Sequence, residues 1–345
     1  MRCLTLADAW AQLGGRSVFL SRTVPDSLRD ETRRRGHEHC TIGVDLSGDY
    51  VVGQAPHARW LGTDETTDAR DTLNALAGRD CQWVIVDHYA LTEIWERIVR
   101  PAARHVLVID DLADRPHDCD LVVDQNYFAA GAARYAARVP AKAGLLIGPA
   151  FALLRPEYAE ARRHLTRGKP TIDRVLVFFG GSDPHGLTAM ALDALADPSF
   201  RHLHVDVVIG QDPVVRAAVE SRAARRPGTT IHGPRLHLAD LMAAADLSLG
   251  AGGATTWERM CLGLRSLVVA VADNQLPVCG ELNRDGLIQL VGAVPRVSAE
   301  DLGAAIRRAI AGAHTNEAML RGMQLSDGCG VARVIDAMRD RSEGV

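Results

Sequence analysis

Lysine is almost absent from this chain. Only Lys142 and Lys169 occur among its 39 basic residues, a bias that we attribute to genomic base composition and not to function. The formal net charge is −4, which argues against a general nucleic-acid-binding surface. No apolar run approaches the roughly 18 residues that a membrane-spanning helix needs, and we find no signal-peptide pattern. Neither nucleic acid nor a membrane is therefore an expected partner.

The chain also lacks paired cysteines and the usual nucleotide signatures. Its seven cysteines include no C-x-x-C pair, and their odd number argues against a complete disulfide framework. We therefore predict a reduced, cytoplasmic protein. Neither the spacing of a dinucleotide fingerprint nor the lysine of a nucleotide-triphosphatase loop is present. Redox and ATP-dependent functions are thus poorly supported, and no cofactor is expected.

Alternating apolar segments predict two α/β domains. A chain of 345 residues with 47% hydrophobic residues can bury two ordinary cores. Buried strands are expected at residues 17–21, 83–86, 105–109, 121–123 and 145–147, and again at 175–179, 204–209, 229–232, 247–249 and 267–271. Helices between them, such as 4–13, 67–77 and 91–99, imply right-handed crossovers and parallel sheets. We expect Rossmann-like domains at 1–150 and 151–345, joined near 148–156 and facing a central cleft.

The most informative segment is the glycine loop between residues 247 and 258. An apolar strand leads into Gly252 and Gly253, and a helix is expected to start near Thr255. Glycines let the backbone approach an anion closely, and the first N–H groups of a helix attract phosphate. Glu258, one turn further, can accept two hydrogen bonds from a ribose diol. A nucleoside diphosphate suits this pattern, although an ordinary strand-to-helix turn with Glu258 favouring the helix dipole is the alternative.

A second glycine loop follows the buried strand at 174–179. It contains Gly180, Gly181, Ser182 and Asp183, and a helix is expected from about Leu187. Open α/β sheets bind ligands outside the carboxyl ends of their strands, where the strand order reverses. Two such loops in one half of the chain therefore indicate one phosphate-binding crevice.

The first expected element is a helix, at residues 2–13, closed by Gly14 and Gly15. A Rossmann-like half normally begins with its central strand and a loop before that helix. We therefore expect the first domain to lack its first strand, with the sheet open at that place. An atypical N-terminal domain is the alternative.

Several motifs, in this order, resemble one enzyme family. They are Arg2-Cys3-Leu4-Thr5-Leu6-Ala7, Val86-Asp87-His88-Tyr89, Ile109-Asp110-Asp111, Cys119-Asp120, Gly148-Pro149 with Ala152-Leu153-Leu154-Arg155, Phe179-Gly180-Gly181-Ser182-Asp183, the glycine loop, and Asn274-Gln275. The sequence is similar to the UDP-sugar hydrolases of pseudaminic acid biosynthesis. That resemblance implies a GT-B fold, related to the lipid II N-acetylglucosaminyltransferase. It also implies metal-independent, inverting hydrolysis of UDP-2,4-diacetamido-2,4,6-trideoxy-β-L-altropyranose to UDP and the free sugar.

The resemblance and the loops together give a set of candidate site residues. Tyr89, Asn274 and His88 are the catalytic candidates, and Asn274 and Gln275 are also expected to hold the sugar. Each of these residues also has a purely structural interpretation: Tyr89 can cap the sheet, His88 can form structural hydrogen bonds, and Asn274 can form a turn. The UDP-binding candidates are Gly181, Ser182, Ile231, Gly252, Gly253, Ala254, Thr255 and Glu258.

Family members also carry a strand and a Gly-x-Gly-His loop immediately before the Arg-Cys-Leu-Thr run. The histidine of that loop is their proposed catalytic base, and here Met1 stands just before Arg2. A general base typically contributes about 10² to 10⁴ in rate, so we expect weak or absent turnover from this chain.

Other patterns have weaker support. Asp118 and Asp120 have the D-x-D spacing of metal-binding glycosyltransferases, but they precede a strand of the first domain. The pairs His37 and His39, and His202 and His204, lack a third ligand at suitable spacing, so no metal site is expected. His185 fits a phosphate contact and an ordinary helix start equally well. A glycosyltransferase using a UDP-sugar donor and a non-catalytic nucleotide-sugar-binding protein remain alternative functions, because a fold alone does not define activity.

Overall fold

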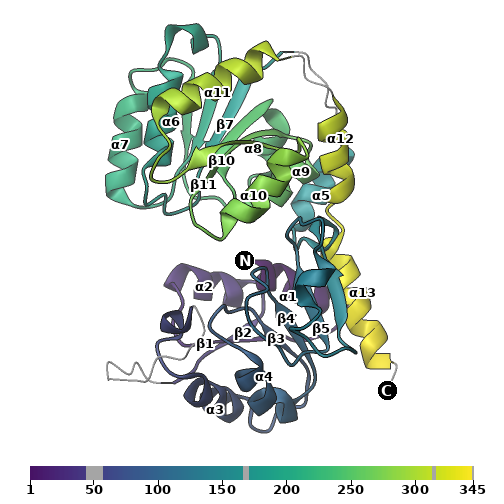
Figure 1. Ribbon diagram of the computed structural model, residues 1–345. Coiled ribbons are helices and arrows are strands. Elements are labelled where there is room, and N and C mark those ends of the chain that lie inside the picture. Colours follow the sequence, from purple (N-terminus) through teal and green to yellow (C-terminus); the bar gives the residue numbers. More distant parts are fainter. Residues whose placement is uncertain (44–56, 166–170, 313–315, 344–345) are drawn as a thin grey trace. The chain divides into compact units, whose positions relative to one another are not determined.

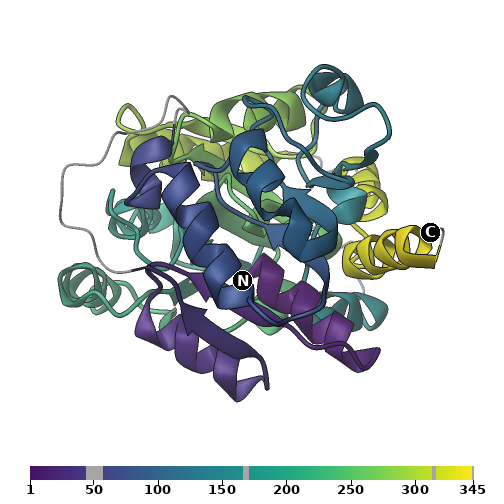
Figure 2. The same ribbon diagram turned by 90° about the horizontal axis from the view of Figure 1, so that it is seen from below.

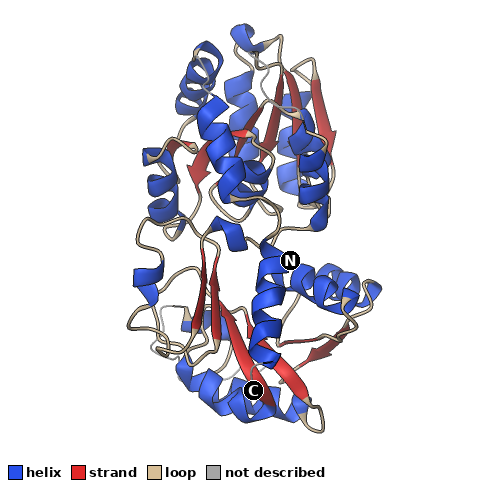
Figure 3. Cartoon of the chain, turned by 90° about the vertical axis from the view of Figure 1, so that its right-hand side faces the viewer, coloured by secondary structure: helices blue, strands red, loops and turns tan. Residues whose placement is uncertain are grey.

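A computed structural model describes residues 1–43, 57–165, 171–312 and 316–343 (Figure 1). The chain divides into two compact units, Met1–Leu153 with Cys329–Val345, and Leu154–Gly328. In each unit parallel strands alternate with helices along the chain, and helices flank the strands (Figure 3). The predicted α/β class with two Rossmann-like units and parallel sheets is confirmed.

The first unit contains two parallel sheets. Its helices are α1 (Arg2–Gln12), α2 (Asp26–Arg34), α3 (Glu65–Leu76), α4 (Glu93–Val99) and α13 (Gly330–Glu343), with short 3-10 turns η1 (Ala58–Leu61), η2 (Arg100–Ala102), η3 (Ala132–Tyr135) and η4 (Pro149–Phe151). The strands β1 (Val18–Ser21) and β2 (Glu38–Thr41) form one sheet, and β3 (Cys81–Val86), β4 (Ala103–Ile109), β5 (Leu121–Asp124) and β6 (Gly144–Ile147) form the other in that order. The larger sheet lies within the core, because β4 and β5 are largely apolar and contribute alternate residues to a buried cluster on each face.

The division between the two sheets leaves strand edges unpaired. Among the described strands, β1 pairs only with β2, and β3 pairs only with β4. Both β1 and β3 line a cavity of about 1170 Å³, which α1, α3 and α13 line as well. The elements α1, β1, α2 and β2, coloured purple, lie together in Figure 2. The side chain of Asp8 on α1 joins them, because it pairs with His37 directly before β2 at 2.9 Å.

The last helix, α13, belongs to the first unit, although the predicted domain boundary placed its residues in the second domain. Its buried residues Val331, Val334, Ile335 and Met338 follow the spacing of one helix face. They join a core cluster with residues of β4 and β5, such as Leu107 and Leu121. The first unit is therefore assembled from both ends of the described chain, and the boundary near residue 150 applies only to the first crossing between units.

The second unit has one six-stranded parallel sheet. Its strands are β7 (Arg174–Phe178), β8 (His204–Val208), β9 (Thr229–His232), β10 (Leu247–Ala251), β11 (Arg265–Ala270) and β12 (Gln289–Ala293), in the spatial order β12-β11-β10-β7-β8-β9. Its helices are α5 (Pro156–Arg163), α6 (Leu187–Leu195), α7 (Pro213–Ala223), α8 (Ala239–Ala244), α9 (Thr255–Cys261), α10 (Gln275–Arg284), α11 (Ala299–Ala311) and α12 (Asn316–Leu325), with the 3-10 turn η5 (Pro198–Phe200).

The order of these strands reverses between β7 and β10. From β7 the chain proceeds outward to β8 and β9, and then returns to the other side of β7 to form β10, β11 and β12. The carboxyl ends of β7 and β10 thus lie side by side at the switch point, where open α/β sheets bind ligands. In the described part of the chain, no helix combines the length and apolar character needed to cross a bilayer.

Candidate functional site

The glycine loop follows β10 directly and leads into α9, as predicted. Gly252 is packed so closely that a Cβ atom there would overlap the Sγ of Cys279. A Cβ at Gly253 would lie 3.6 Å from its nearest neighbour, the Nε2 of Gln275, which is an ordinary contact. The first glycine therefore serves packing, whereas the second leaves space beside the loop.

A buried arginine supports this loop from below. Arg259 of α9 donates through Nη2 to the carbonyl of Ala251 at 2.8 Å and to the hydroxyl of Thr256 at 3.0 Å. Its side chain approaches Gly250 so closely that a Cβ at that position would overlap its guanidinium. Burial lowers the pKa of Arg259 to about 10, so the group remains charged at neutral pH. Arg259 was not predicted as a site residue, because the sequence around an arginine inside a helix does not indicate a partner in the preceding loop.

The loop after β7 differs from the expected phosphate loop in one respect. Asp183 is buried, and its two carboxylate oxygens accept hydrogen bonds from the backbone N–H groups of Leu187 and Thr188 at 3.0 and 2.9 Å. The start of α6 is thus already occupied by a carboxylate of the chain itself. Gly181, Ser182 and His185 are exposed in this loop and remain accessible to an anion.

Glu258 lies one turn into α9, half-buried beside Tyr158 of α5. Burial raises the pKa of Glu258 to about 7, against the opposing effects of a hydrogen bond from Tyr158 and the charges of Arg259 and Arg155. The Tyr158 oxygen also accepts a hydrogen bond from the N–H of Leu238 at 3.1 Å, which fixes its orientation. Glu258 is therefore a carboxyl group that changes its protonation state near neutral pH, a property that its position in the sequence did not indicate.

Gln275 is positioned beside the glycine loop, and Asn274 is not bound to it. The Oε1 of Gln275 accepts a hydrogen bond from the N–H of Val271 at 3.0 Å, and its Nε2 is the nearest atom to the Cβ position of Gly253. Asn274 is the exposed N-cap residue of α10 and makes no side-chain cap hydrogen bond. The structure thus places the Gln275 amide at this loop, whereas Asn274 is exposed at the start of α10.

Ile231 lies further from the loop than the other candidates. It is half-buried on β9, the edge strand, where it pairs with Val207 of β8. Two strands, β7 and β8, separate β9 from β10. The adjacent His232 is held by the carboxylate of Asp206 at 2.8 Å, so this strand end is fixed by the chain itself.

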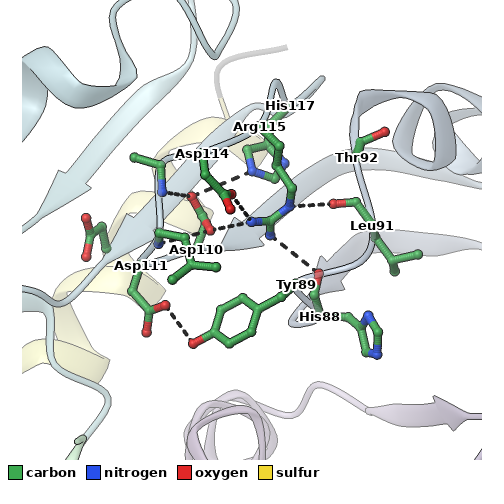
Figure 4. A network of polar contacts seen from close by, with 12 residues as sticks. His88, Tyr89, Leu91, Thr92, Asp110, Asp111, Asp114, Arg115 and His117 are labelled. Atoms are coloured by element: carbon green, nitrogen blue, oxygen red, sulfur yellow. Dashed lines mark hydrogen bonds and ion pairs between the residues drawn. The ribbon is translucent and has the colours of Figure 1, made fainter. Parts of the chain in front are cut away.

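In the first unit, Tyr89 follows the end of β3 and lies in a chain of charged groups (Figure 4). Its hydroxyl donates to Oδ1 of Asp111 at 2.7 Å. Arg2 pairs with the other oxygen of Asp111 at 3.1 Å and with Asp87 at 2.7 Å. Burial and then the charge of Asp111 raise the pKa of Tyr89 above its ordinary range. Tyr89 therefore remains a neutral hydroxyl, whose oxygen can accept a hydrogen bond while its proton points to a carboxylate.

His88 has a structural role in this turn. Its Nδ1 accepts a hydrogen bond from the N–H of Ala90 at 3.2 Å, and burial lowers its pKa, which favours the neutral ring. Arg115 holds the same turn from the other side, donating to the carbonyls of Leu91 at 2.8 Å and His88 at 3.4 Å (Figure 4). Its guanidinium also lies 5.9 Å from the centre of the Tyr89 ring. Arg115 thus stabilises the turn that carries Tyr89, while Asp111 binds the Tyr89 hydroxyl.

A fully buried network anchors Arg115. Asp110 accepts from Arg115 at 2.9 Å, and His117 lies between Asp110 and Glu96, with its Nδ1 2.7 Å from Glu96. Burial alone would lower the pKa of His117, but the two carboxylates raise it to about 9. A protonated histidine therefore links two buried acids, and the network is rigid at neutral pH.

The weaker candidates Asp118, Asp120 and His39 have partners within the fold. Arg100 pairs with both Asp118 and Asp120, at 2.9 and 3.0 Å, so the D-x-D pair is an ion-pair partner of an arginine. His39 contacts the hydroxyl of Ser21 at 2.8 Å. His185 is exposed. Within the described ranges, no group of three or more His, Cys, Asp or Glu side chains is arranged to hold a metal ion.

Comparisons with known proteins complete this description. No family model matches the chain. SpsG of Bacillus subtilis (strain 168), a spore coat polysaccharide biosynthesis protein, is 28% identical over 199 residues, which are 57% of this chain and 58% of that protein. The match thus spans little more than half of the relative.

Solved structures match over nearly the full length. The calicheamicin glycosyltransferase CalG4 superposes with a TM-score of 0.65 at 17% identity, covering 100% of this chain and 95% of that one. UGT89C1 of Arabidopsis thaliana, solved in complex with UDP, gives a TM-score of 0.64 at 13% identity, covering 97% and 95%. At such identities the similarity defines the fold alone, and the chain therefore has a GT-B type fold with two Rossmann-like units.

Proposed function

We propose that this protein hydrolyses a UDP-sugar, with UDP-2,4-diacetamido-2,4,6-trideoxy-β-L-altropyranose as its substrate. The observation that carries the proposal is the switch point of the second unit. There the glycine loop and the exposed Gly181 and Ser182 follow the ends of the neighbouring strands β10 and β7, and Glu258 lies one turn into the helix α9 that follows the loop. Phosphate oxygens suit the loop N–H groups, and a ribose diol suits a carboxylate with a pKa of about 7.

Comparisons support a nucleotide-sugar ligand. CalG4 is a glycosyltransferase and UGT89C1 was solved with UDP, while SpsG acts in polysaccharide biosynthesis. These are properties of those proteins, and the sugar assigned here rests on the resemblance of the sequence motifs. We assign UDP binding to the second unit. The residues assigned to the diphosphate are Gly252, Gly253, Ala254 and Thr255. Asn274 and Gln275 are assigned to the sugar, and the ribose to Glu258.

The reaction requires an attacking water and a stabilised leaving group. The water oxygen bonds to the anomeric carbon, the bond from that carbon to the β-phosphate oxygen breaks, and UDP leaves with its electron pair. Attack opposite UDP inverts the anomeric centre. In the proposal the water proton passes to the Tyr89 oxygen as the Tyr89 proton moves to Asp111, along the 2.7 Å hydrogen bond. Donors arranged around the leaving diphosphate are commonly worth about 3 to 4 kcal/mol each.

An NMR time course of the anomeric signals, with no acceptor present, tests the proposal. Release of free sugar in step with UDP is expected, at a low rate because the family's catalytic histidine has no counterpart here, and the first-formed anomer should be the inverted one. UDP release only after an acceptor is added would instead identify a glycosyltransferase. Binding of the UDP-sugar, lost in Glu258→Ala, with no turnover under either condition would identify a binding protein. Failure to bind UDP at all would refute every part of the proposal.

A further inference from the structure

Three aromatic rings gather beside the proposed catalytic tyrosine. The ring centres of His57 and Trp60 are 4.6 Å apart, those of His57 and Tyr89 are 5.6 Å apart, and those of Trp60 and Tyr89 are 5.9 Å apart. Trp60 is 63% exposed, whereas Trp95 and Trp257 are 5% and 2% exposed. Trp60 lies in the 3-10 turn η1, and its exposed indole next to two further rings forms a flat apolar surface that a ligand can cover.

The local structure holds Trp60 in this outward position. The 3-10 turn η1 buries Ala58 and Leu61 in the first unit, at 6% and 8% exposure, and these two residues fix the turn. Gly62 ends it in the left-handed conformation, with φ of 74°. A hydrogen bond between the His88 side chain and the backbone of Trp60 stabilises the turn further. The exposed indole is therefore presented by a supported backbone and not by a loose loop.

Charged groups lie at the edge of the aromatic cluster. The Tyr89 hydroxyl donates to Asp111, and Arg2 joins Asp111 to the exposed Asp87. Aromatic faces bearing partial negative charge attract the C–H bonds on one face of a pyranose ring, while its hydroxyl and amide groups need polar partners at the rim. A flat apolar surface bordered by hydrogen-bonding groups is the combination that a carbohydrate requires.

We propose that Trp60, with His57 and Tyr89, forms a stacking platform for the pyranose ring of the substrate. This inference rests on the proposed function and deepens it, because it names residues that would contact the sugar. A 6-deoxy sugar whose C6 is a methyl group, with two acetamido methyls, carries more apolar surface than an ordinary hexose, which suits such a platform. Trp60 is a positioning residue in this scheme, and it takes no part in proton transfer.

The test uses fluorine NMR of the full chain labelled with 5-fluorotryptophan. The chain contains five tryptophans, and Trp60→Phe identifies the signal of Trp60 by its loss. The free 2,4-diacetamido-2,4,6-trideoxy sugar is titrated into the sample, and UDP binding is measured separately by calorimetry. The sugar should shift the Trp60 signal while the buried Trp95 signal stays in place. In turnover, Trp60→Ala should raise KM about 3- to 10-fold with UDP affinity unchanged, and Trp60→Phe should restore most of it.

The outcomes separate this inference from the proposed function. Normal UDP binding with an unmoved Trp60 signal and an unchanged KM in Trp60→Ala would overturn the platform and leave the nucleotide site intact. Absent UDP binding would refute the proposed function, whatever Trp60 does. The Trp60 signal could instead shift with protein concentration and not with added sugar. That result would show that the exposed ring contacts a second copy of the chain, and it would also overturn the platform.

Discussion

The carboxylate of Glu258 gives the sharpest test of the nucleotide site. Burial raises its pKa from an ordinary 4.5 to about 7, so the free protein holds this group about half protonated at neutral pH. Ribose hydroxyls donate to the ionised form, and binding must therefore remove the proton. Below pH 7 each unit of pH should weaken UDP about tenfold through this group, or roughly 30-fold between pH 8.5 and 5.5.

Replacement of Glu258 by Gln removes the charge and keeps the shape. Hydrogen bonds to a charged group contribute about 1.5 to 3 kcal/mol, so UDP should bind about 10- to 150-fold more weakly above pH 7. This penalty should shrink as the pH falls, because the native side chain then becomes neutral too. The phosphate of UDP titrates near pH 6 in both proteins, so the ratio of the two dissociation constants isolates Glu258.

Calorimetry of both proteins from pH 5.5 to 8.5 measures that ratio. UDP lacking both ribose hydroxyls is the matched ligand control, and it should bind the native protein and Glu258→Gln with similar affinity. A ratio that does not change with pH, or a hydroxyl contribution that persists in Glu258→Gln, would show that Glu258 does not hold the ribose.

Further predictions concern the loop, the buried network and the catalytic tyrosine. Gly252→Ala should lower the free energy of unfolding by about 1 to 3 kcal/mol, because its Cβ overlaps Cys279. Gly253→Ala should leave stability unchanged and weaken UDP binding. Chemical denaturation and calorimetry compare the two variants, and greater destabilisation by Gly253→Ala would contradict the assignment. The pKa of His117 rises from 6.5 to about 9 on folding, so its contribution is complete below pH 6.5 and disappears as the pH rises through 9. At about 1.4 kcal/mol per unit this is roughly 3 kcal/mol, and His117→Gln should abolish that part of the pH dependence in denaturation curves; an equal loss in both proteins would rule it out. Tyr89→Phe should reduce turnover about 10²-fold without weakening UDP, as judged by kcat and calorimetry, and an unchanged kcat would remove Tyr89 from the mechanism.

Much of the fold was predictable because its strands are continuous apolar segments. The strands β4, β7 and β10 are buried on both faces, so composition alone located them. The strand β2, with the sequence Glu-His-Cys-Thr, has no apolar pattern and was missed. The place of α13 was missed for another reason: its apolar face was visible in the sequence, but the partner of that face was not.

The candidate site was predictable only where local sequence determines it. Glycines after a strand predicted the loop at Gly252, and the end of β3 predicted the place of Tyr89. The contacts that tune these groups join distant positions: Asp111 reaches Tyr89, and Tyr158 reaches Glu258. Such pairings arise from the packing of whole elements, so no spacing within a short segment indicates them.

The divided sheet of the first unit has a consequence for how that unit opens. The strands β1 and β2 form a two-stranded sheet of four residue pairs, and isolated two-stranded sheets are marginally stable. Arg22, just after β1, ties this part to α3 through Asp68 and Asp71. The sheet from β3 to β6 instead has a buried apolar cluster on each face. Local unfolding should therefore release β1 and β2 at a lower free energy than the rest, which makes amide exchange and proteolysis begin between residues 18 and 41.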